Sequence, residues 1–179
     1  MRIQHIILFS VLLLPACAVA SRPERGKLIS QWETNNNVFK IRVSEYEEKG
    51  AFLGGAYYVF ESAPLNSDTW QQIMIFRHDD RVGIAKDQVR FVDERTGYTF
   101  MGLMCAVTKD GGANWTVWDA TKDLPDWQCC NYGLIQELSI ALNGKGIMRL
   151  NPIPQRRGEV PELRTTDYGQ HWSVAQDDV

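Results

Sequence analysis

The sequence predicts an all-β protein built from repeated β-meander units, and three observations support this prediction. Aromatic residues make up 11% of the 179 residues, with six Trp, and such large rings suit the apolar layer between sheets. An eight-residue turn motif occurs twice. Apolar and polar residues alternate in several segments, as they do in half-buried strands. The 44% of hydrophobic residues suffices for a packed core and excludes wholesale disorder.

The first 20 residues are predicted to form an export signal. Arg2 precedes an apolar run over residues 6–14, and Ala18-Val19-Ala20 fits the small-x-small rule of signal peptidase. The run is shorter than the roughly 20 residues that a membrane span needs. A second interpretation is that residues 14–17 form a lipobox, which leaves Cys17 as a lipidated N-terminus. The expected location is therefore periplasmic or secreted, or at a membrane only through a lipidated Cys17.

Two copies of a turn motif carry the strongest signal in the remaining domain, residues 21–179. Residues 108–115 and 165–172 both read Ser/Thr-x-Asp-x-Gly-x-x-Trp. In such a turn the Asp carboxylate accepts hydrogen bonds from backbone N–H groups about two residues further on. Gly supplies a positive φ, and Trp begins the outgoing strand and fills the apolar layer. The residues predicted to hold these turns are Thr108, Asp110, Gly112, Trp115, Thr165, Asp167, Gly169 and Trp172.

The repeat extends beyond the turns. Apolar segments precede Gly97 and Gly146 at the same distance, and a degenerate third copy ends at Trp70. The three Trp are then spaced by roughly 45–57 residues, which is typical of repeated β units. The predicted units are residues 28–77, 88–118 and 135–175.

Alternation supports strands within these units. Phe39, Ile41 and Val43 are predicted to face one side of a sheet, with Lys40, Arg42 and Ser44 on the other. Leu103, Cys105 and Val107 alternate in the same way with Met104, Ala106 and Thr108. Residues 134–142 also fit a helix face, but their spacing matches the segment that starts at Val89, so a strand is preferred.

The two turn motifs, together with residues 91–98, resemble Asp-box (bacterial neuraminidase) repeats, and most closely those of photosystem II stability/assembly factor-like proteins. The resemblance covers residues 88–175 well and residues 38–77 weakly. It implies that each unit is a four-stranded blade of a β-propeller. It also implies that the Asp box is a structural turn at the blade's periphery and not catalytic, and that a partner binds through an Arg-rich surface.

Closed propellers usually have about 4–8 blades, whereas the residues after the signal suffice for about three. The fold class is therefore an incomplete, propeller-like array. Three arrangements stay open: a compact arc of three sheets, which is favoured, a ring closed by a homodimer, and a collapsed sandwich-like domain.

Three cysteines follow the signal, and export to an oxidising compartment allows a disulfide. Cys105 could bridge to either Cys129 or Cys130, or all three could be buried thiols. The odd number leaves at least one Cys free or paired between chains. The CxxC and Cys–His spacings of metal sites are missing from the sequence.

Catalysis is not expected, and neither is a cofactor or a metal. Asp79 and Asp80 are adjacent, so on a strand their carboxylates would point to opposite faces, which suits paired acid–base work poorly. His78 is not accompanied by a nucleophile motif. Glu45, Glu47 and Glu48 are expected to form a solvated strand end. Phosphate loops and dinucleotide fingerprints are likewise missing.

A binding role is the favoured prediction. A formal net charge of −3 argues against a nucleic-acid partner. Arg156 and Arg157 lie in a Pro-rich insertion, where they could grip a carboxylate or an acidic partner surface. We therefore expect an exported, non-enzymatic binding or assembly module whose partner is a protein or a glycan. The alternatives are a divergent sialidase-related or glycan-binding protein, with glycoside hydrolysis as the main enzymatic option, and a small periplasmic inhibitor or immunity-type protein.

Overall fold

The computed structural model describes residues 25–48, 55–78, 81–123, 134–151 and 162–175. Several predictions concern residues outside these ranges: the export signal with Cys17, the Asp79-Asp80 pair, Cys129 and Cys130, and the Arg156-Arg157 pair.

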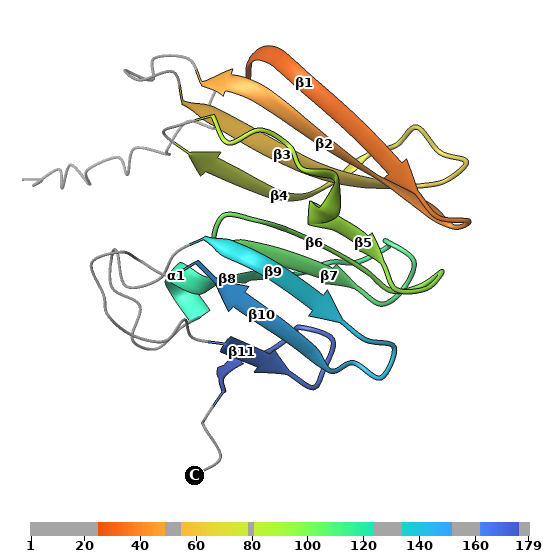
Figure 1. Ribbon diagram of the computed structural model, residues 1–179. Helices are drawn as coiled ribbons and strands as arrows, with labels where there is room; N and C mark the ends of the chain where they lie inside the picture. The colour runs from red at the N-terminus through yellow and green to blue at the C-terminus, as the bar shows by residue number, and fades with distance from the viewer. Residues whose placement is uncertain (1–24, 49–54, 79–80, 124–133, 152–161, 176–179) are drawn as a thin grey trace, which may run out of the picture.

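The described residues form three four-stranded antiparallel sheets (Figure 1). The first contains β1 (Arg25–Asn35), β2 (Phe39–Glu48), β3 (Ala56–Pro64) and β4 (Gln71–His78). The second contains β5 (Val89–Phe91), β6 (Gly97–Met101), β7 (Met104–Thr108) and β8 (Thr116–Asp119). The third contains β9 (Ile135–Ile140), β10 (Gly146–Leu150), β11 (Glu162–Thr165) and β12 (Ser173–Val174).

In each sheet the strands lie side by side in chain order. The predictions of an all-β fold and of three four-stranded antiparallel units are therefore confirmed, and the ambiguous segment from residue 134 is a strand, β9. The helical elements are two short turns, η1 (Lys86–Gln88) before β5 and α1 (Ala120–Asp123) after β8. Within the described ranges, helices of the length and apolarity needed to cross a bilayer are not found.

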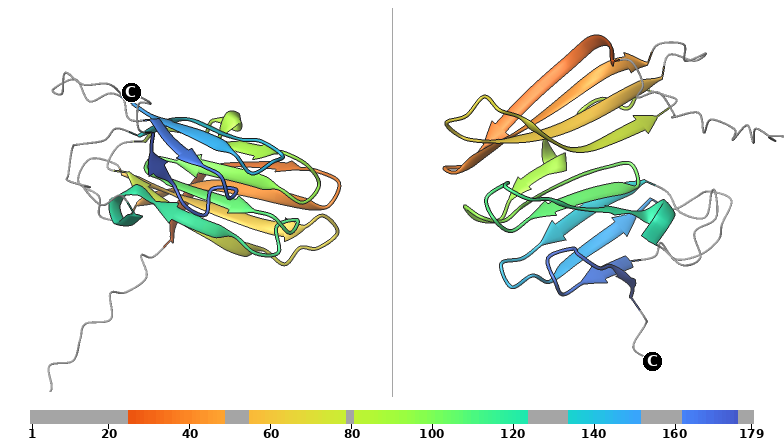
Figure 2. Two further views of the ribbon diagram at one scale, coloured as in Figure 1. Left: turned by 90° about the horizontal axis from the view of Figure 1, so that it is seen from below. Right: turned by 180° about the vertical axis from the view of Figure 1, so that it is seen from behind.

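The second sheet lies between the other two, with one hydrophobic core on each of its faces (Figures 1 and 2). The core shared with the first sheet includes Phe39, Ile41, Val43, Tyr58, Phe60, Phe76, Met101 and Ala106. The core shared with the third sheet includes Tyr98, Phe100, Cys105, Val107, Trp118, Leu138, Ile140, Met148, Leu163 and Trp172.

Strand patterning follows from these positions. Every residue of β6 is buried, because both faces of the middle sheet are covered. In β7, Cys105 and Val107 face the third sheet while Ala106 faces the first, as the alternation predicts. In the third sheet, β10 and β11 bury every second residue. One face of the third sheet is therefore open to solvent, and we call it the outer face of that sheet.

The turn between the first two strands of each sheet repeats a feature that the sequence analysis did not identify. Asn36, Asp93 and Asn143 each accept, through a side-chain oxygen, a hydrogen bond from the backbone N–H two residues later. This is an Asx turn. Each of these turns also receives a backbone hydrogen bond from the turn between strands three and four: Leu65 N–H donates to Val38, Gly111 N–H to Arg95, and Tyr168 N–H to Gly144. In each sheet, a backbone hydrogen bond therefore joins the two turns that lie at this end of the strands.

Candidate functional site

The two predicted turns have the same hydrogen-bond network. In the first Asp turn (residues 108–115), Gly112 N–H donates to Thr108 Oγ1 at 3.0 Å, and Asn114 N–H donates to Asp110 Oδ1 at 2.9 Å. In the second Asp turn (residues 165–172), Gly169 N–H donates to Thr165 Oγ1 at 2.9 Å, and His171 N–H donates to Asp167 Oδ1 at 3.0 Å. In both turns the carboxylate accepts from an N–H four residues later rather than two. The Thr hydroxyl also donates to the Asp carboxylate in both.

Two consecutive left-handed residues shape each turn. Gly111 and Gly112 have φ values of 71° and 83°, and Tyr168 and Gly169 have φ values of 62° and 77°. Tyr168 is the sole non-glycine residue with positive φ in the part of the chain described. Its Oη donates to the carbonyl of Leu142 at 2.6 Å, and this bond helps to hold a backbone conformation that L-residues resist.

Hydrogen bonds lower the pKa of both turn carboxylates. Partial burial raises the pKa of Asp167, but the hydrogen bonds from the His171 ring, the His171 backbone and Thr165 outweigh it and bring the pKa to about 2. For Asp110, partial burial is likewise outweighed by the backbone and side chain of Asn114 and by Thr108, so its pKa falls below its ordinary value. Both carboxylates are therefore fixed acceptors in the turn rather than groups poised for proton transfer.

The Gly and Trp of each turn pack against the preceding sheet. A Cβ on Gly112 would lie 2.8 Å from the Phe39 ring, and one on Gly169 would lie 3.0 Å from Val107. Trp115 Nε1 donates to Ser62 Oγ of the first sheet at 2.9 Å. The two Trp differ in burial, however: Trp172 lies in the core with 8% exposure, whereas Trp115 is half-buried at the edge. Both Trp contact a hydrophobic core, Trp172 as a buried member of it and Trp115 from its edge.

Trp70 and its turn depart from this pattern. Ser67 Oγ accepts a hydrogen bond from Thr69 N–H, in place of the Asp-centred network. The Asp68 side chain is fully exposed, and its nearest cation, Lys40, lies 3.5 Å away. Trp70 lies over Arg42 and Lys40, at 4.0 and 5.0 Å from its ring centre. These two residues alternate with inward-facing Phe39 and Ile41, so Trp70 lies on the face of the first sheet that is turned away from the second.

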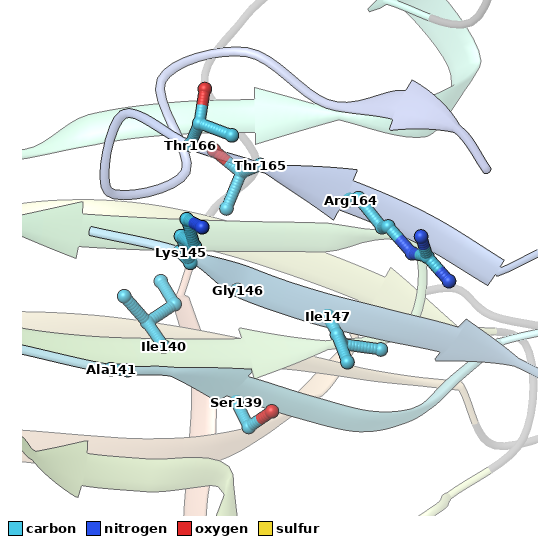
Figure 3. A pocket seen from close by; sticks show the side chains of 9 residues that line it. All are labelled: Ser139, Ile140, Ala141, Lys145, Gly146, Ile147, Arg164, Thr165 and Thr166. Carbon is cyan, nitrogen blue, oxygen red and sulfur yellow. The ribbon is translucent and has the colours of Figure 1, made fainter. Parts of the chain in front are cut away.

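The outer face of the third sheet carries a pocket of about 560 Å³ (Figure 3). A row of cross-strand neighbours, Ser139, Ile147 and Arg164, crosses it from β9 through β10 to β11. Lys145 lies at its turn end, beside the first residues of β10. We call it the outer pocket; the residues that line it are Ser139, Ile140, Ala141, Lys145, Gly146, Ile147, Arg164, Thr165 and Thr166.

The outer pocket combines apolar surface with positive charge. Ile147 and Ala141 offer apolar contact, Ser139 and Thr166 offer hydroxyl groups, and Lys145 and Arg164 are cations; its lining includes no carboxylate. Within the described residues the Lys145 ammonium is not part of an ion pair. Such a surface suits a ligand with an apolar part and an anionic group.

A network of ion pairs beside the outer pocket holds Arg164. Its Nε donates to Glu162 at 3.0 Å, and Glu162 also accepts from Arg149 Nε at 3.3 Å. Arg149 in turn reaches Glu137 at 2.9 Å. The two arginines and two glutamates of this network balance in charge, so among the described residues the unpaired cation of the outer pocket is Lys145, while Arg164 keeps N–H donors that Glu162 does not use. The sequence analysis did not identify this pocket.

Glu45 corrects a second expectation. It is 3% exposed rather than a solvated strand end, and its carboxylate accepts from Ser30 Oγ at 2.7 Å and from Arg81 Nε at 3.0 Å. Tyr58 Oη lies 3.5 Å from it and accepts hydrogen bonds from the backbone N–H groups of Val82 and Gly83. Desolvation by burial is the main cause that raises the pKa of Tyr58. This cluster anchors the segment between the first two sheets.

Cys105 is a free thiol that is completely buried, which agrees with the alternative of a buried thiol. Burial raises the pKa of its thiol well above the ordinary value, and a hydrogen bond from Trp172 lowers it only in part. His171 lies in the second Asp turn with its Nδ1 2.6 Å from Asp167. Among the described residues, groups of three or more His, Cys, Asp or Glu that could hold a metal do not occur.

No family model, curated protein or solved structure matches the chain. The resemblance to Asp-box repeats stays a prediction that rests on the turn motif.

Proposed function

We propose that this protein is an exported, non-enzymatic binding module that holds an anionic group of a protein partner in the outer pocket. The observation that carries the proposal is the concave, cation-rimmed surface on an otherwise open sheet face. Rigid β scaffolds commonly present recognition surfaces of this kind. Export follows from the sequence of residues 1–20 alone.

We also propose that the three sheets are consecutive blades of an incomplete, propeller-like array. The support is the identical strand order in the three sheets and the packing of each Asp turn against the sheet before it. The outer face of the third sheet is open to solvent at one end of such an array, and a partner can meet it there.

The chemistry of the outer pocket favours a carboxylate attached to an apolar group. The Arg164 guanidinium offers planar, charge-assisted hydrogen bonds and Lys145 adds a point charge, while Ile147 and Ala141 give apolar contact for the rest of the ligand. Arg156 and Arg157 belong to the segment that connects β10 to β11, next in sequence to this sheet, and they stay a predicted contribution to the same partner.

The proposal is tested by NMR titration of the chain after residue 20 with short peptides that carry Asp or Glu beside an aromatic residue. Amide signals of Ile147 and Arg164 are expected to shift, and Arg164→Glu should weaken binding at least about tenfold, a loss of about 1.4 kcal/mol. Lys86→Glu, an exposed lysine on η1, is the matched control. The proposal fails if acidic peptides shift no signal of the outer pocket; binding of acidic glycans instead would favour the glycan-binding alternative.

A further inference from the structure

Each Asp turn packs against the sheet that precedes it in the chain, so contacts between neighbouring sheets always run the same way. The first Asp turn places Gly112 and Trp115 on the first sheet, and the second Asp turn places Gly169 and Trp172 on the second. Each unit therefore uses its turn between strands three and four to contact the exposed face of the unit before it.

The outer pocket lies at the position where the next turn in this series would pack. In the second sheet, Gly169 lies against Val107, whose partner on β6 is Tyr98. Gly97 and Thr108 form the β6–β7 pair nearest the turns, and Tyr98 and Val107 form the next pair along the strands. In the third sheet the corresponding pair is Ile147 with Arg164, one residue beyond Gly146 with Thr165. The pocket therefore repeats, on the outer face, the surface that receives a turn inside the stack.

The matching turn lies at the opposite end of the stack (Figure 2). The turn between β3 and β4 carries Trp70 on the outward side of the first sheet. The strand residues Ser44 and Val59 on that side are buried, but Trp70 is half-buried and Asp68 is fully exposed, so the turn itself can meet a partner. Asp68, two residues before Trp70, adds a fully exposed carboxylate to the same turn. An aromatic residue beside a carboxylate is the ligand chemistry that Ile147, Lys145 and Arg164 favour.

We propose that the partner in the outer pocket is a second copy of this chain, which inserts its β3–β4 turn so that Asp68 pairs with Lys145 and Arg164 and Trp70 packs near Ile147. The inference rests on the proposed function, because it uses the same pocket. Surface patches at opposite ends of one molecule make a head-to-tail contact, in which the third sheet of one copy receives the turn of the next.

The test is a charge exchange followed by sedimentation equilibrium. The wild-type chain is expected to self-associate, while Asp68→Arg and Arg164→Asp should each weaken self-association at least about tenfold. An equimolar mixture of the two single variants, or the double variant, should recover most of it because the charges again match. Lys86→Glu should associate like the wild type. Circular dichroism checks that each variant is folded, which the exposure of both side chains favours.

A wild-type chain that stays monomeric at all concentrations would overturn this inference, and so would single variants that associate normally. Failure of the inference is distinguishable from failure of the proposed function. If acidic peptides shift the pocket signals of a strictly monomeric chain, the pocket binds anions but its partner is not a second copy. If the peptides shift nothing and the chain is monomeric, both are wrong.

Discussion

At the scale of single residues, the turn carboxylates show how one side chain organises a whole turn. Asp110 and Asp167 each accept hydrogen bonds from a hydroxyl and from backbone N–H groups that would otherwise have no protein partner. The ionised form accepts these bonds best, because protonation turns one carboxylate oxygen into a hydroxyl donor and weakens the charge-assisted bonds. Their stabilisation therefore depends on pH.

Asp167 gives a prediction for acid unfolding. Its pKa is about 2 in the folded chain, below the ordinary value of 3.8, so its contribution is complete above about pH 4 and is lost as the pH falls towards 2. The side chain is 37% exposed, and after discounting for solvent screening we expect about 1 kcal/mol. Urea unfolding of wild type and Asp167→Asn should therefore differ by this amount at pH 6 and converge near pH 2. A difference that does not change with pH would contradict this role.

Glu45 shows which residues sequence reasoning misses. The alternation of Phe39, Ile41 and Val43 predicts the inward face of β2 correctly, and Glu45 is the next residue in that series. The sequence analysis nevertheless predicted a solvated strand end, because Glu45 is charged and Glu47 and Glu48 follow it closely. The period-two pattern was thus the signal that could have identified it, but its partner Arg81 lies 36 residues away, which a sequence pattern does not reveal.

At the scale of elements, the turns and strands were largely predictable because their causes are local. Positive φ at Gly112 and Gly169 follows from turn chemistry, and the strands follow from alternation. The strand character of β9 needed the repeat, since its apolar residues also fit a helix. The outer pocket was not predictable, because it depends on the pairing of β10 with β11 across a long insertion, and sequence spacing does not determine that register.

Gly112 tests the packing of a turn on the preceding sheet. Gly112→Ala would place a methyl group 2.8 Å from Phe39 in addition to straining a φ of 83°. We expect a loss of about 2–4 kcal/mol in the free energy of unfolding from strain and overpacking together. Gly83→Ala is the matched control, because Gly83 has a φ of 71° but no atom within 4 Å of a new Cβ, so its cost is about 1–2 kcal/mol. Equal losses in urea unfolding would show that the turn does not pack tightly on the first sheet.

At the scale of the whole molecule, a hydrophobic core fills each interface between the three sheets, and polar contacts add to it. Ile135 N–H donates to the Gly102 carbonyl at 2.7 Å between the second and third sheets. Trp115 and Ser62 join the first two sheets at one end. Glu45, Tyr58 and Arg81 fasten the connecting segment to the first sheet. Without such anchors, sheets stacked only by apolar contact are free to slide, since hydrophobic burial has no direction.

The Glu45 cluster gives the last prediction. Glu45→Gln keeps the shape but leaves Arg81 without its charge partner, and since Arg81 is itself half-exposed we expect a loss of about 1–3 kcal/mol. Tyr58→Phe removes the acceptor for the N–H groups of Val82 and Gly83, whose hydrogen exchange should therefore become faster in both variants. Because the two side chains share one network, their effects on unfolding should fall short of additivity by at least about 0.5 kcal/mol.

The control is Glu33→Gln, on the neighbouring strand, whose exposed carboxylate lies 3.9 Å from Arg42. This variant should change the free energy of unfolding by less than about 0.5 kcal/mol. Additive losses with unchanged exchange at Val82 and Gly83 would mean that Glu45 and Tyr58 stabilise the first sheet independently and do not hold the connecting segment.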